Sequence, residues 1–500
     1  MSTTKAPIIA IVGRTNVGKS SLFNCMLKRR EAIVADEPGT TRDSISARAS
    51  WQDQDFWIVD TAGMKDPEDD FEFTIQEQIE QATESADIIM VTIEADIGIT
   101  DDDRKLARQA LKSKKTVILA VNKADKVKGA KPEDYQRLGI KDIVLTAATQ
   151  NRGISELMDF FVANIQKVSI NIDPDTITFA LLGRPNVGKS YLFNTLAKKQ
   201  QAIVAERAGT TRDINRAIVK YNKKSIQLLD TAGIRRSGKI ERGVEKFSVI
   251  RSISAIEQAD ICALVMDVNE LNTQLDQKIA GMIKEAGKGL IIIVSKWDSL
   301  KEREDEEQDD LTIGYGSEED DIYKTTADSN RKLSKAEKLR QAKSNSSGEG
   351  DEIYKTEFTR DQIAPQIQQS FAFVPWAPLI FTSSVTGQNV TKIFELLNTI
   401  RDASEKLITT PDLNRWLHQI TDIHPPAGLK NKNPKLRYII QEKDNPTNFK
   451  VYGSDTKFLH WSYKRFMDRK LREKYGFIGS PVKFWFFDSR DDSPAIYTKR

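Results

Sequence analysis

The sequence predicts an α/β fold that is built twice in tandem and is followed by a smaller α+β domain. Three observations predict it: short motifs that recur at a constant offset of 170 residues, buried strand-like runs that alternate with polar helical patterns, and a change of pattern near residue 405. Alternating buried strands and helices are typical of a doubly wound, mostly parallel sheet with helices on both faces. With 500 residues, the chain is also too long for a single hydrophobic core.

The composition is that of an ordinary soluble protein, with 39% hydrophobic and 29% charged residues. No apolar run approaches the roughly 18 residues that a membrane span needs, and the opening MSTTK lacks the apolar stretch of a signal peptide. We therefore expect a cytoplasmic protein without a membrane partner. Residues 401–500 hold 20 Lys and Arg against 12 Asp and Glu, which favours a polyanionic partner at that end.

The tandem duplication is visible in three pairs of motifs. GRTNVGKS begins at Gly13 and returns 170 residues later as GRPNVGKS. GTTRD begins at Gly39 and DTAG at Asp60, and both return unchanged at the same offset. Chance matches would not keep one register over three motifs, so the pairs indicate an internal repeat of a whole domain.

Each copy continues as strand-like runs that are followed by helical patterns. IIAIVG, FWIVD, ADIIMVTI and KTVILAVN in the first copy are matched by ITFALLG, SIQLLD, ADICALVMDV and GLIIIVS in the second. A charged, Ser- and Gly-containing stretch at about 301–356 interrupts the second copy, and its composition predicts disorder. We therefore place a first domain at 1–166, a linker at 167–176, a second domain at 177–404 and a third at 405–500.

The first motif of each pair predicts a phosphate-binding P-loop, because it follows a strand and opens a helix. Its glycines let backbone N–H groups curl around phosphate oxygens, and the helix N-terminus favours their negative charge. Lys19 is expected to reach the β- and γ-phosphates, and Ser20 to ligate Mg²⁺. The two loops contribute Gly13, Gly18, Lys19, Ser20 and Ser21 in the first copy, and Gly183, Gly188, Lys189 and Ser190 in the second.

The other two motifs predict the rest of a Mg²⁺–phosphate site. The aspartate of DTAG ends a strand, where its carboxylate can hold Mg²⁺ through a water. The glycine of DTAG can offer a backbone N–H to the γ-phosphate, which permits a switch, and the second threonine of GTTRD can complete the Mg²⁺ shell. These residues are Asp60, Gly63 and Thr41 in the first copy and Asp230, Gly233 and Thr211 in the second.

NKAD, which begins at Asn122, predicts that the base is guanine. The Asp125 carboxylate can accept both the N1–H and the exocyclic N2–H of guanine, a donor pair that adenine lacks. The stem of Lys123 can lie across the ring, and the Asn122 amide can pair with the edge of the base.

The second copy departs from this pattern at one position. Lys296 and Asp298 are retained, but Ser295 replaces the asparagine. Serine is shorter and has no amide, so we expect guanine to be selected with weaker affinity. Thr146-Ala147 and Ser383-Ser384 follow later strands and could supply a backbone contact to the guanine oxygen.

The residue after each DTAG is apolar, Met64 in the first copy and Ile234 in the second. Many GTPases place a glutamine there to orient the attacking water. Hydrolysis is therefore expected to be slow without another element. No side chain stands out as a general base, so the predicted catalytic residues are those that stabilise charge: Lys19, Thr41, Lys189 and Thr211.

The last hundred residues predict three strands, YIIQ, NFKVYG and VKFWFF, with an amphipathic helix, LHWSYKRFMDRKLREKYG, before the third. Basic side chains on this helix suit phosphate contacts, which depend on salt and carry no sequence information. They are Lys464, Arg465, Arg469, Lys470, Arg472 and Lys474, and the apolar Trp461, Phe466, Met467 and Leu471 are expected to face the sheet.

The GFIG sequence that begins at Gly476 matches the GxxG of RNA-binding KH folds. It lies between a helix and a strand, however, whereas an RNA-clamping GxxG lies between helices. We therefore interpret it as a turn that ends the helix.

The paired GTTRD, GRTNVGKS with GRPNVGKS, and the C-terminal RKLREKYGFIGSPVKF together resemble the Der (EngA) family of bacterial ribosome-assembly GTPases over nearly the whole chain. The resemblance implies two P-loop GTPase domains that bind GTP or GDP, and a KH-like third domain. It further implies GTP hydrolysis and a role in maturation of the large (50S) ribosomal subunit through ribosomal RNA. Relatives without the glutamine use K⁺ bound partly by a P-loop asparagine, a role that we carry over to Asn16 and Asn186 as a hypothesis.

Two other functions stay open. A GTPase of RNA modification or of membranes would carry one such domain, so the tandem repeat argues against it. A GTP-dependent scaffold with a passive or weakly active second domain has Ser295 as its only support. We expect the chain to act as a monomer.

Overall fold

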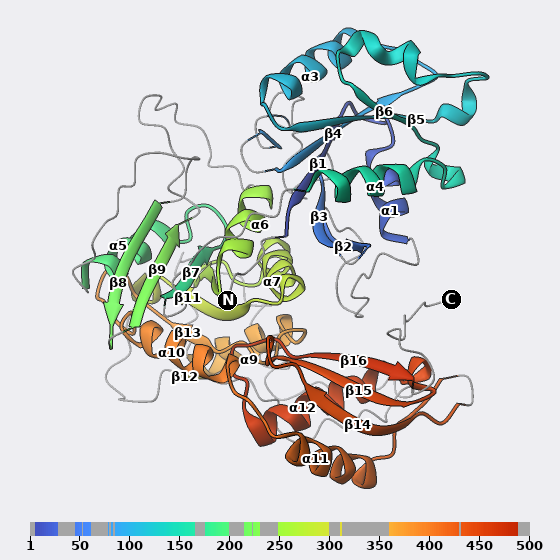
Figure 1. Cartoon of the computed structure of the whole chain (residues 1–500). Coiled ribbons are helices and arrows are strands. Elements are labelled where there is room, and N and C mark those ends of the chain that lie inside the picture. The colour runs from blue at the N-terminus through green and yellow to red at the C-terminus, as the bar shows by residue number, and fades with distance from the viewer. Residues whose placement is uncertain are drawn as a thin grey trace, which may run out of the picture.

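A computed structural model describes residues 6–28, 46–52, 54–61, 79, 82–83, 86–165, 176–199, 215–222, 224–230, 249–299, 311–312, 360–429 and 432–488. They form two large sheets and one small sheet with their helices (Figure 1), which confirms the predicted fold class. The predicted linker and insertion lie almost wholly outside these residues. Within the described part of the chain, no helix has the length and apolarity needed to cross a bilayer.

The first sheet has six strands in the order β2-β3-β1-β4-β5-β6. β2 runs antiparallel to β3, and the other neighbours are parallel. Helices α1 and α4 cover one face, and α3 packs on the other. The elements are β1 (Ile8–Gly13), α1 (Lys19–Lys28), β2 (Ser46–Trp51), β3 (Gln54–Asp60), β4 (Ile88–Glu94), α3 (Asp101–Lys112), β5 (Thr116–Asn122), β6 (Asp142–Leu145) and α4 (Ile154–Asn164), with 3-10 turns η1 (Ala124–Lys126), η2 (Pro132–Leu138) and η3 (Ala148–Gln150).

The second sheet repeats this order, β13-β11-β10-β7-β9-β8, and adds the short β12 beside β13. Helices α5 and α10 cover one face, and α6, α7 and α9 the other. The elements are β7 (Thr176–Leu182), α5 (Lys189–Lys199), β8 (Asn215–Tyr221), β9 (Lys224–Asp230), α6 (Val249–Gln258), β10 (Ile261–Asp267), α7 (Gln274–Ala286), β11 (Gly289–Ser295), η4 (Trp297–Ser299), β12 (Leu311–Thr312), α9 (Arg360–Ser370), β13 (Leu379–Phe381) and α10 (Lys392–Ser404).

The parallel pairing brings the predicted motifs to one edge of each sheet. In the first sheet β1 ends at Gly13, β3 at Asp60 and β5 at Asn122. In the second sheet β9 ends at Asp230 and β11 at Ser295. Because the carboxyl ends of parallel strands share an edge, segments far apart in the sequence meet there.

The third sheet is small, with β15 between β14 and β16. β14 and β15 are antiparallel, β15 and β16 are parallel, and two helices cover one face through a separate apolar core. The elements are α11 (Thr410–Ile423), β14 (Lys435–Gln441), β15 (Asn448–Ser454), η5 (Thr456–Phe458), α12 (Trp461–Tyr475) and β16 (Lys483–Asp488). The three predicted strands and the amphipathic helix before the third are present, and α11 is a second helix on the same sheet.

Two expectations for α12 are wrong. Trp461 does not face the sheet, because its side chain is 44% exposed at the first position of the helix. Arg472 does not face solvent, because it is 3% exposed and donates to the backbone carbonyls of Phe477 (2.7 Å) and Ser480 (2.9 Å). It holds the chain that follows the helix and is not available to phosphates.

The GFIG segment ends α12 as predicted and also docks the third domain on the second. Gly476 caps the helix with φ 90°. The Gly479 carbonyl accepts a hydrogen bond from Leu290 N–H, and the Gly479 N–H donates one to the Trp376 carbonyl, both at 2.8 Å. Its φ is 66°, and a Cβ there would lie 2.4 Å from the Ile400 side chain, so only glycine fits this contact.

The two large domains share one continuous apolar core, in which α6 of the second domain lies against strands of the first (Figure 1). Glu257, near the end of α6, is 5% exposed and accepts two hydrogen bonds across this boundary. The donors are Ala6 N–H at 3.1 Å and Trp57 Nε1 at 2.7 Å. Arg48 lies 4.0 Å from the same carboxylate. Since β3 carries Trp57 and ends at Asp60, the contact joins α6 to a strand that leads into the first nucleotide site.

A Glu257→Ala variant is expected to loosen the boundary between the two domains. The change leaves two buried donors unpaired and costs about 3 kcal/mol at the interface. Hydrogen exchange of the 6–13 peptide should therefore accelerate. Glu395→Ala, which removes an exposed carboxylate that accepts from Tyr221 inside the second domain, is the control and should leave that peptide unchanged. Equal exchange in Glu257→Ala and the parent would contradict the assigned role.

Charged groups from all three domains also gather near the start of β16. Burial and, to a lesser extent, the Arg48 charge lower the pKa of Lys483 to about 8, against the attraction of Asp55, Glu257 and Glu285. Burial also raises the pKa of Glu285, on α7, to about 7, although Lys284, Arg48 and Lys483 oppose the rise. A positive charge at Lys483 is therefore unfavourable in the folded chain.

Replacing Lys483 by Met should remove a pH dependence of stability. The folded chain loses this proton near pH 8 and the unfolded chain near about 10.4, so stability rises with pH between these values. As the pH is raised from 7 to 10, the thermal midpoint of the parent should therefore increase relative to that of Lys483→Met. Lys450→Met is the control, because pairing with Glu442 raises the pKa of Lys450. Parallel curves for the parent and Lys483→Met would refute the assignment.

Candidate nucleotide sites

The loop after the first strand of each large sheet has a curled backbone. Asn16 and Gly18 have φ angles of 64° and 92°, and the matching Asn186 and Gly188 have 63° and 97°. Gly and Asn tolerate this left-handed region better than other residues do, which accounts for their use here. The two predicted P-loops therefore have the same conformation at these positions.

The first residue of each loop must be glycine, because there is no space for a side chain at that position. A Cβ on Gly13 would lie 2.5 Å from the Thr92 carbonyl oxygen, and one on Gly183 would lie 2.3 Å from that of Val265. Both carbonyls belong to the neighbouring parallel strand. A side chain would push the loop away from the sheet edge.

The lysine of each loop lies inside the curl. Lys19 is 4% exposed and donates from Nζ to the carbonyls of Gly13 (2.7 Å) and Arg14 (2.6 Å). Lys189 is 6% exposed and donates to Gly183 (2.9 Å) and to the Arg184 carbonyl. Each ammonium is thus held where the loop N–H groups can surround a phosphate chain.

The predicted Mg²⁺ ligands of the first copy meet in the structure. Ser20 Oγ donates to Asp60 Oδ2 at 2.6 Å, and Asp60 is 2% exposed. A hydroxyl and a carboxylate beside the P-loop are the hard oxygen donors that Mg²⁺ takes beside a nucleotide phosphate, so these residues fit the ion. Asp230 is equally buried at the matching strand end, and Ser190 is the second residue of α5. Among the described residues, no group of three or more His, Cys, Asp or Glu side chains is arranged so that it could hold a metal ion.

Four predicted site residues lie outside the described residues: Thr41, Gly63, Thr211 and Gly233. Their roles stay predictions. Met64 and Ile234, which follow the DTAG motifs, lie outside them as well.

Asn122 joins two loops at the first site. It is 2% exposed, and its Nδ2 donates to the Val17 carbonyl of the P-loop at 2.9 Å. Its Oδ1 accepts from Ala148 N–H at 3.3 Å and from Thr146 Oγ1 at 3.4 Å, both in the loop after β6. Asp125 is exposed beside them, and its carboxylate accepts from Gln150 Nε2 at 3.4 Å. The carboxylate predicted to read guanine is thus open to a base.

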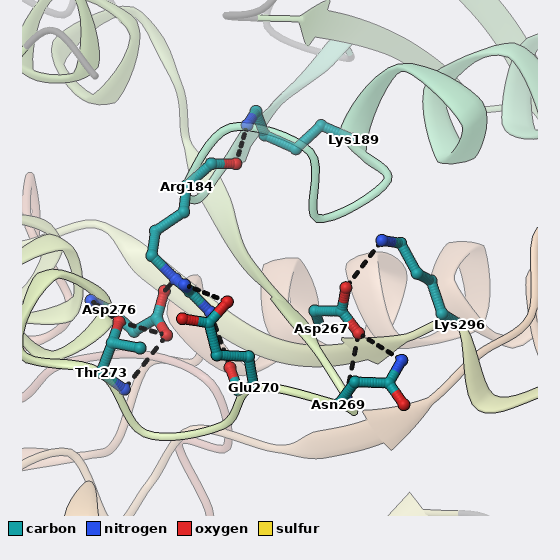
Figure 2. A network of polar contacts seen from close by, with 8 residues as sticks. All are labelled: Arg184, Lys189, Asp267, Asn269, Glu270, Thr273, Asp276 and Lys296. Carbon is teal, nitrogen blue, oxygen red and sulfur yellow. Dashed lines mark hydrogen bonds and ion pairs between the residues drawn. The ribbon is translucent and has the colours of Figure 1, made fainter. Parts of the chain in front are cut away.

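At the second site Ser295 is also 2% exposed, but its hydroxyl meets different partners. It lies 2.5 Å from the Val187 carbonyl of the P-loop and 2.9 Å from the Met266 carbonyl of β10. Lys296 Nζ pairs with Asp267 at 2.6 Å (Figure 2). Burial tends to raise the pKa of Asp267, but the donors on Lys296 and Asn269 lower it overall. Asp298 is exposed, like its counterpart in the first copy.

Each P-loop is braced by a buried ion pair that the sequence reading missed. Arg14 Nε lies 2.8 Å from Asp103, which is fully buried and closes the capping box of α3 with Thr100. Arg184 repeats the pair with Asp276 at 3.3 Å, as Figure 2 shows. Burial raises the pKa of Asp276, although the hydrogen bonds from Thr273 and the charge of Arg184 oppose the rise. Two repeated features of the sequence could have indicated this ion pair: the Gly-Arg at the start of each P-loop and a Thr-x-x-Asp capping pattern in each copy.

Comparison with known proteins assigns a family to each of the three domains. A family profile described as a 50S ribosome-binding GTPase matches residues 8–123 and again 178–296. A second, described as the KH-domain-like C-terminal part of EngA bacterial GTPase enzymes, matches residues 408–486. The G domain of the FeoB iron transporter of T. maritima aligns at 23% identity with a TM-score of 0.25, over 32% of this chain and 99% of that one. This last likeness carries no argument.

The full-length relatives are more informative. GTPase Der of Lachnoclostridium phytofermentans is 36% identical over 489 residues, which covers 97% of this chain and 99% of that protein. GTPase Der of Caldanaerobacter subterraneus subsp. tengcongensis is 36% identical over 479 residues, or 95% and 97% of the two chains. The matches run through both P-loop domains and the KH-like domain. The chain is a GTP-hydrolysing enzyme and belongs to the Der (EngA) family of GTPases.

Proposed function

We propose that the protein is a ribosome biogenesis factor in which two GTPase switches control binding of the third domain to RNA of the large (50S) ribosomal subunit. The observation that carries the proposal is the direct docking of the KH-like domain on the second GTPase domain. Gly479 exchanges two backbone hydrogen bonds with Leu290, at the base of β11, and with Trp376. β11 ends at Ser295, so one strand joins the docking point to the second nucleotide site.

The RNA-contacting surface that we propose lies on α12. Arg465, Arg469 and Lys474 are exposed there. The guanidinium of Arg465 stacks on the exposed Trp461 ring at 4.7 Å, which presents a cation beside an aromatic face. Arg472 is excluded by its burial. Such contacts would be electrostatic and blind to sequence, so the specificity must come from the shape of the ribosomal site.

The site residues support an in-line attack of water on the γ-phosphate. Lys19 and Lys189 would stabilise the developing charge, assisted by Thr41 and Thr211. Bound Mg²⁺ supplies charge neutralisation of the phosphates, and Ser20 with Asp60 and Ser190 with Asp230 would hold it. Base recognition would fall to Asp125 and Asp298.

A potassium ion is part of the proposal for both sites. The observation behind it is the left-handed P-loop asparagine, with Asn16 and Asn186 exposed at matching positions. Turnover at equal ionic strength should be faster in KCl than in NaCl. Equal turnover in the two salts would remove the ion from the mechanism.

We further propose a cytoplasmic monomer with domains at 1–166, 177–404 and 405–500. The proposed starts of the second and third domains are supported by family matches that begin at residues 178 and 408. Sedimentation of the free protein tests the monomer.

The RNA-contacting surface can be tested by a triple replacement. Arg465→Ala, Arg469→Ala and Lys474→Ala together should weaken binding to purified large subunits and lower its salt dependence, because fewer phosphate contacts release fewer counterions. GTP turnover of the free protein should not change. The control replaces the exposed Lys105, Lys112 and Lys128 of the first domain by Ala. Equal binding by the triple variant and the parent would rule out α12 as the contact.

A further inference from the structure

The two nucleotide sites offer a comparison within one molecule, because their folds match and their contacts do not. At the first site Asn122 connects three segments: β5, which carries it, the P-loop through Val17, and the loop after β6 through Ala148. The P-loop is predicted to surround the phosphates, and the loop after β6 is predicted to contact the base. Asn122 therefore ties the two halves of the site together.

Ser295 keeps only one of these ties. Its hydroxyl still reaches the P-loop at the Val187 carbonyl. Its second contact, the Met266 carbonyl, belongs to the neighbouring strand of the sheet. Ser295 and the loop after β13, residues 382–388, both belong to the described residues, and no hydrogen bond joins the Ser295 side chain to this loop. The serine thus contacts the P-loop without tying it to the base-side loop. The helix after each P-loop does reach that loop, through Thr195 Oγ1 and the Ser384 carbonyl at the second site and through Cys25 Sγ and the Ala148 carbonyl at the first, so the difference between the sites lies in Asn122 and Ser295.

The following lysine shows the same difference. Lys123 Nζ donates to the Asn16 carbonyl of the P-loop at 3.0 Å and also pairs with Glu94. Lys296 pairs with Asp267, which is one methylene shorter than Glu94 and also accepts from Asn269. Lys296 has no bond to the P-loop among the contacts of the described residues. Among the described residues, a direct bond from this lysine to the P-loop is thus present at the first site only.

The space under the two P-loops agrees with these contacts. A Cβ on Gly18 would lie 2.2 Å from Asn122 Nδ2, whereas one on Gly188 would lie 3.7 Å from Ser295 Oγ. The first P-loop is packed tightly on its base-reading residue. The second P-loop has more space between its glycine and Ser295.

We propose that this difference makes the first site a slow-exchanging nucleotide holder and the second a fast-exchanging one, with residues 122–123 and 295–296 setting the release rates. The inference rests on guanine-nucleotide binding at both sites. Release requires the P-loop and the base-side loop to separate, and each tie that must break slows it by about tenfold. The second domain would then follow the cellular GTP/GDP ratio, while the first keeps its nucleotide between turnovers.

The test follows release of a fluorescent GDP from the full chain after dilution into unlabelled GDP. The parent should show two phases that differ by about tenfold to a hundredfold, with one equivalent in each. Ser295→Asn should slow only the fast phase by about tenfold, and adding Asp267→Glu should slow it further. Ser295→Ala should accelerate the fast phase, because it removes the P-loop tie that serine keeps. Asn122→Ser should accelerate only the slow phase.

A control at a distant serine separates this role from damage to the fold. Ser404→Asn, at a serine whose hydroxyl donates to the Arg401 carbonyl in its own helix, should leave both phases unchanged. One common release phase in the parent, or a fast phase that Ser295→Asn leaves within twofold, would overturn the proposal. Failure to bind guanine nucleotide at all would instead overturn the assignment of the sites.

Discussion

An Asp125→Asn variant is expected to lose GTP binding at the first site and to gain binding of a xanthine nucleotide there. The carboxylate is exposed and accepts from Gln150 Nε2 at 3.4 Å, so it is free to turn toward a base. Asparagine cannot accept both guanine N–H groups, and the loss of two charge-assisted hydrogen bonds weakens GTP binding on the order of a thousandfold. Xanthine carries a carbonyl where guanine carries its amino group, so the new amide can donate to it.

Asp298→Asn should have the same effect at the second site only. Titration with a fluorescent GTP analogue should give two equivalents for the parent and one for each variant, and a xanthine analogue should fill the other site. Asp142→Asn, at an exposed aspartate that begins β6, is the control. Two tight GTP equivalents in either variant would show that the carboxylate does not read the base.

Replacing the P-loop lysines is expected to have the second large effect, on hydrolysis. Lys19 and Lys189 carry buried ammonium groups held inside their loops by carbonyl oxygens. Removing one such preorganised cation typically lowers the rate by about a hundredfold to a thousandfold. Each single variant should therefore keep the turnover of the other site, and Lys19→Ala with Lys189→Ala should abolish turnover.

The residual activity of Lys19→Ala also decides between the proposal and its rival. Activity that disappears when Lys189→Ala is added would show that the second domain hydrolyses GTP. No residual hydrolysis in Lys19→Ala alone would favour a scaffold whose second domain only holds nucleotide. Lys112→Ala, at an exposed lysine in the last turn of α3, should match the parent throughout.

Much of the fold and the positions of the motifs could be predicted from local sequence. Buried strands and P-loops depend on short runs of residues, and the constant offset of 170 residues ordered them. The contact between Ser20 and Asp60 could be predicted because the carboxyl ends of parallel strands lie at the same edge of a sheet. Such features repeat in both copies and therefore stand out.

Contacts between distant segments could not be predicted in the same way. Nothing near Glu257 marks it as the acceptor for Trp57 of another domain, 200 residues away. Arg472 has the sequence context of a phosphate-binding arginine, yet its place above the GFIG turn buries it. The substitution at Ser295 was visible, but its consequence was not, because it depends on which carbonyls surround the hydroxyl.

The most direct test of the central claim is co-sedimentation of the full chain with purified ribosomal subunits, in the presence of GDP or a non-hydrolysable GTP analogue. We predict capture on the large subunit with the analogue and release with GDP, and loss of capture in the α12 triple variant. Equal binding in both nucleotide states, or no binding to the large subunit, would contradict a GTP-gated assembly factor.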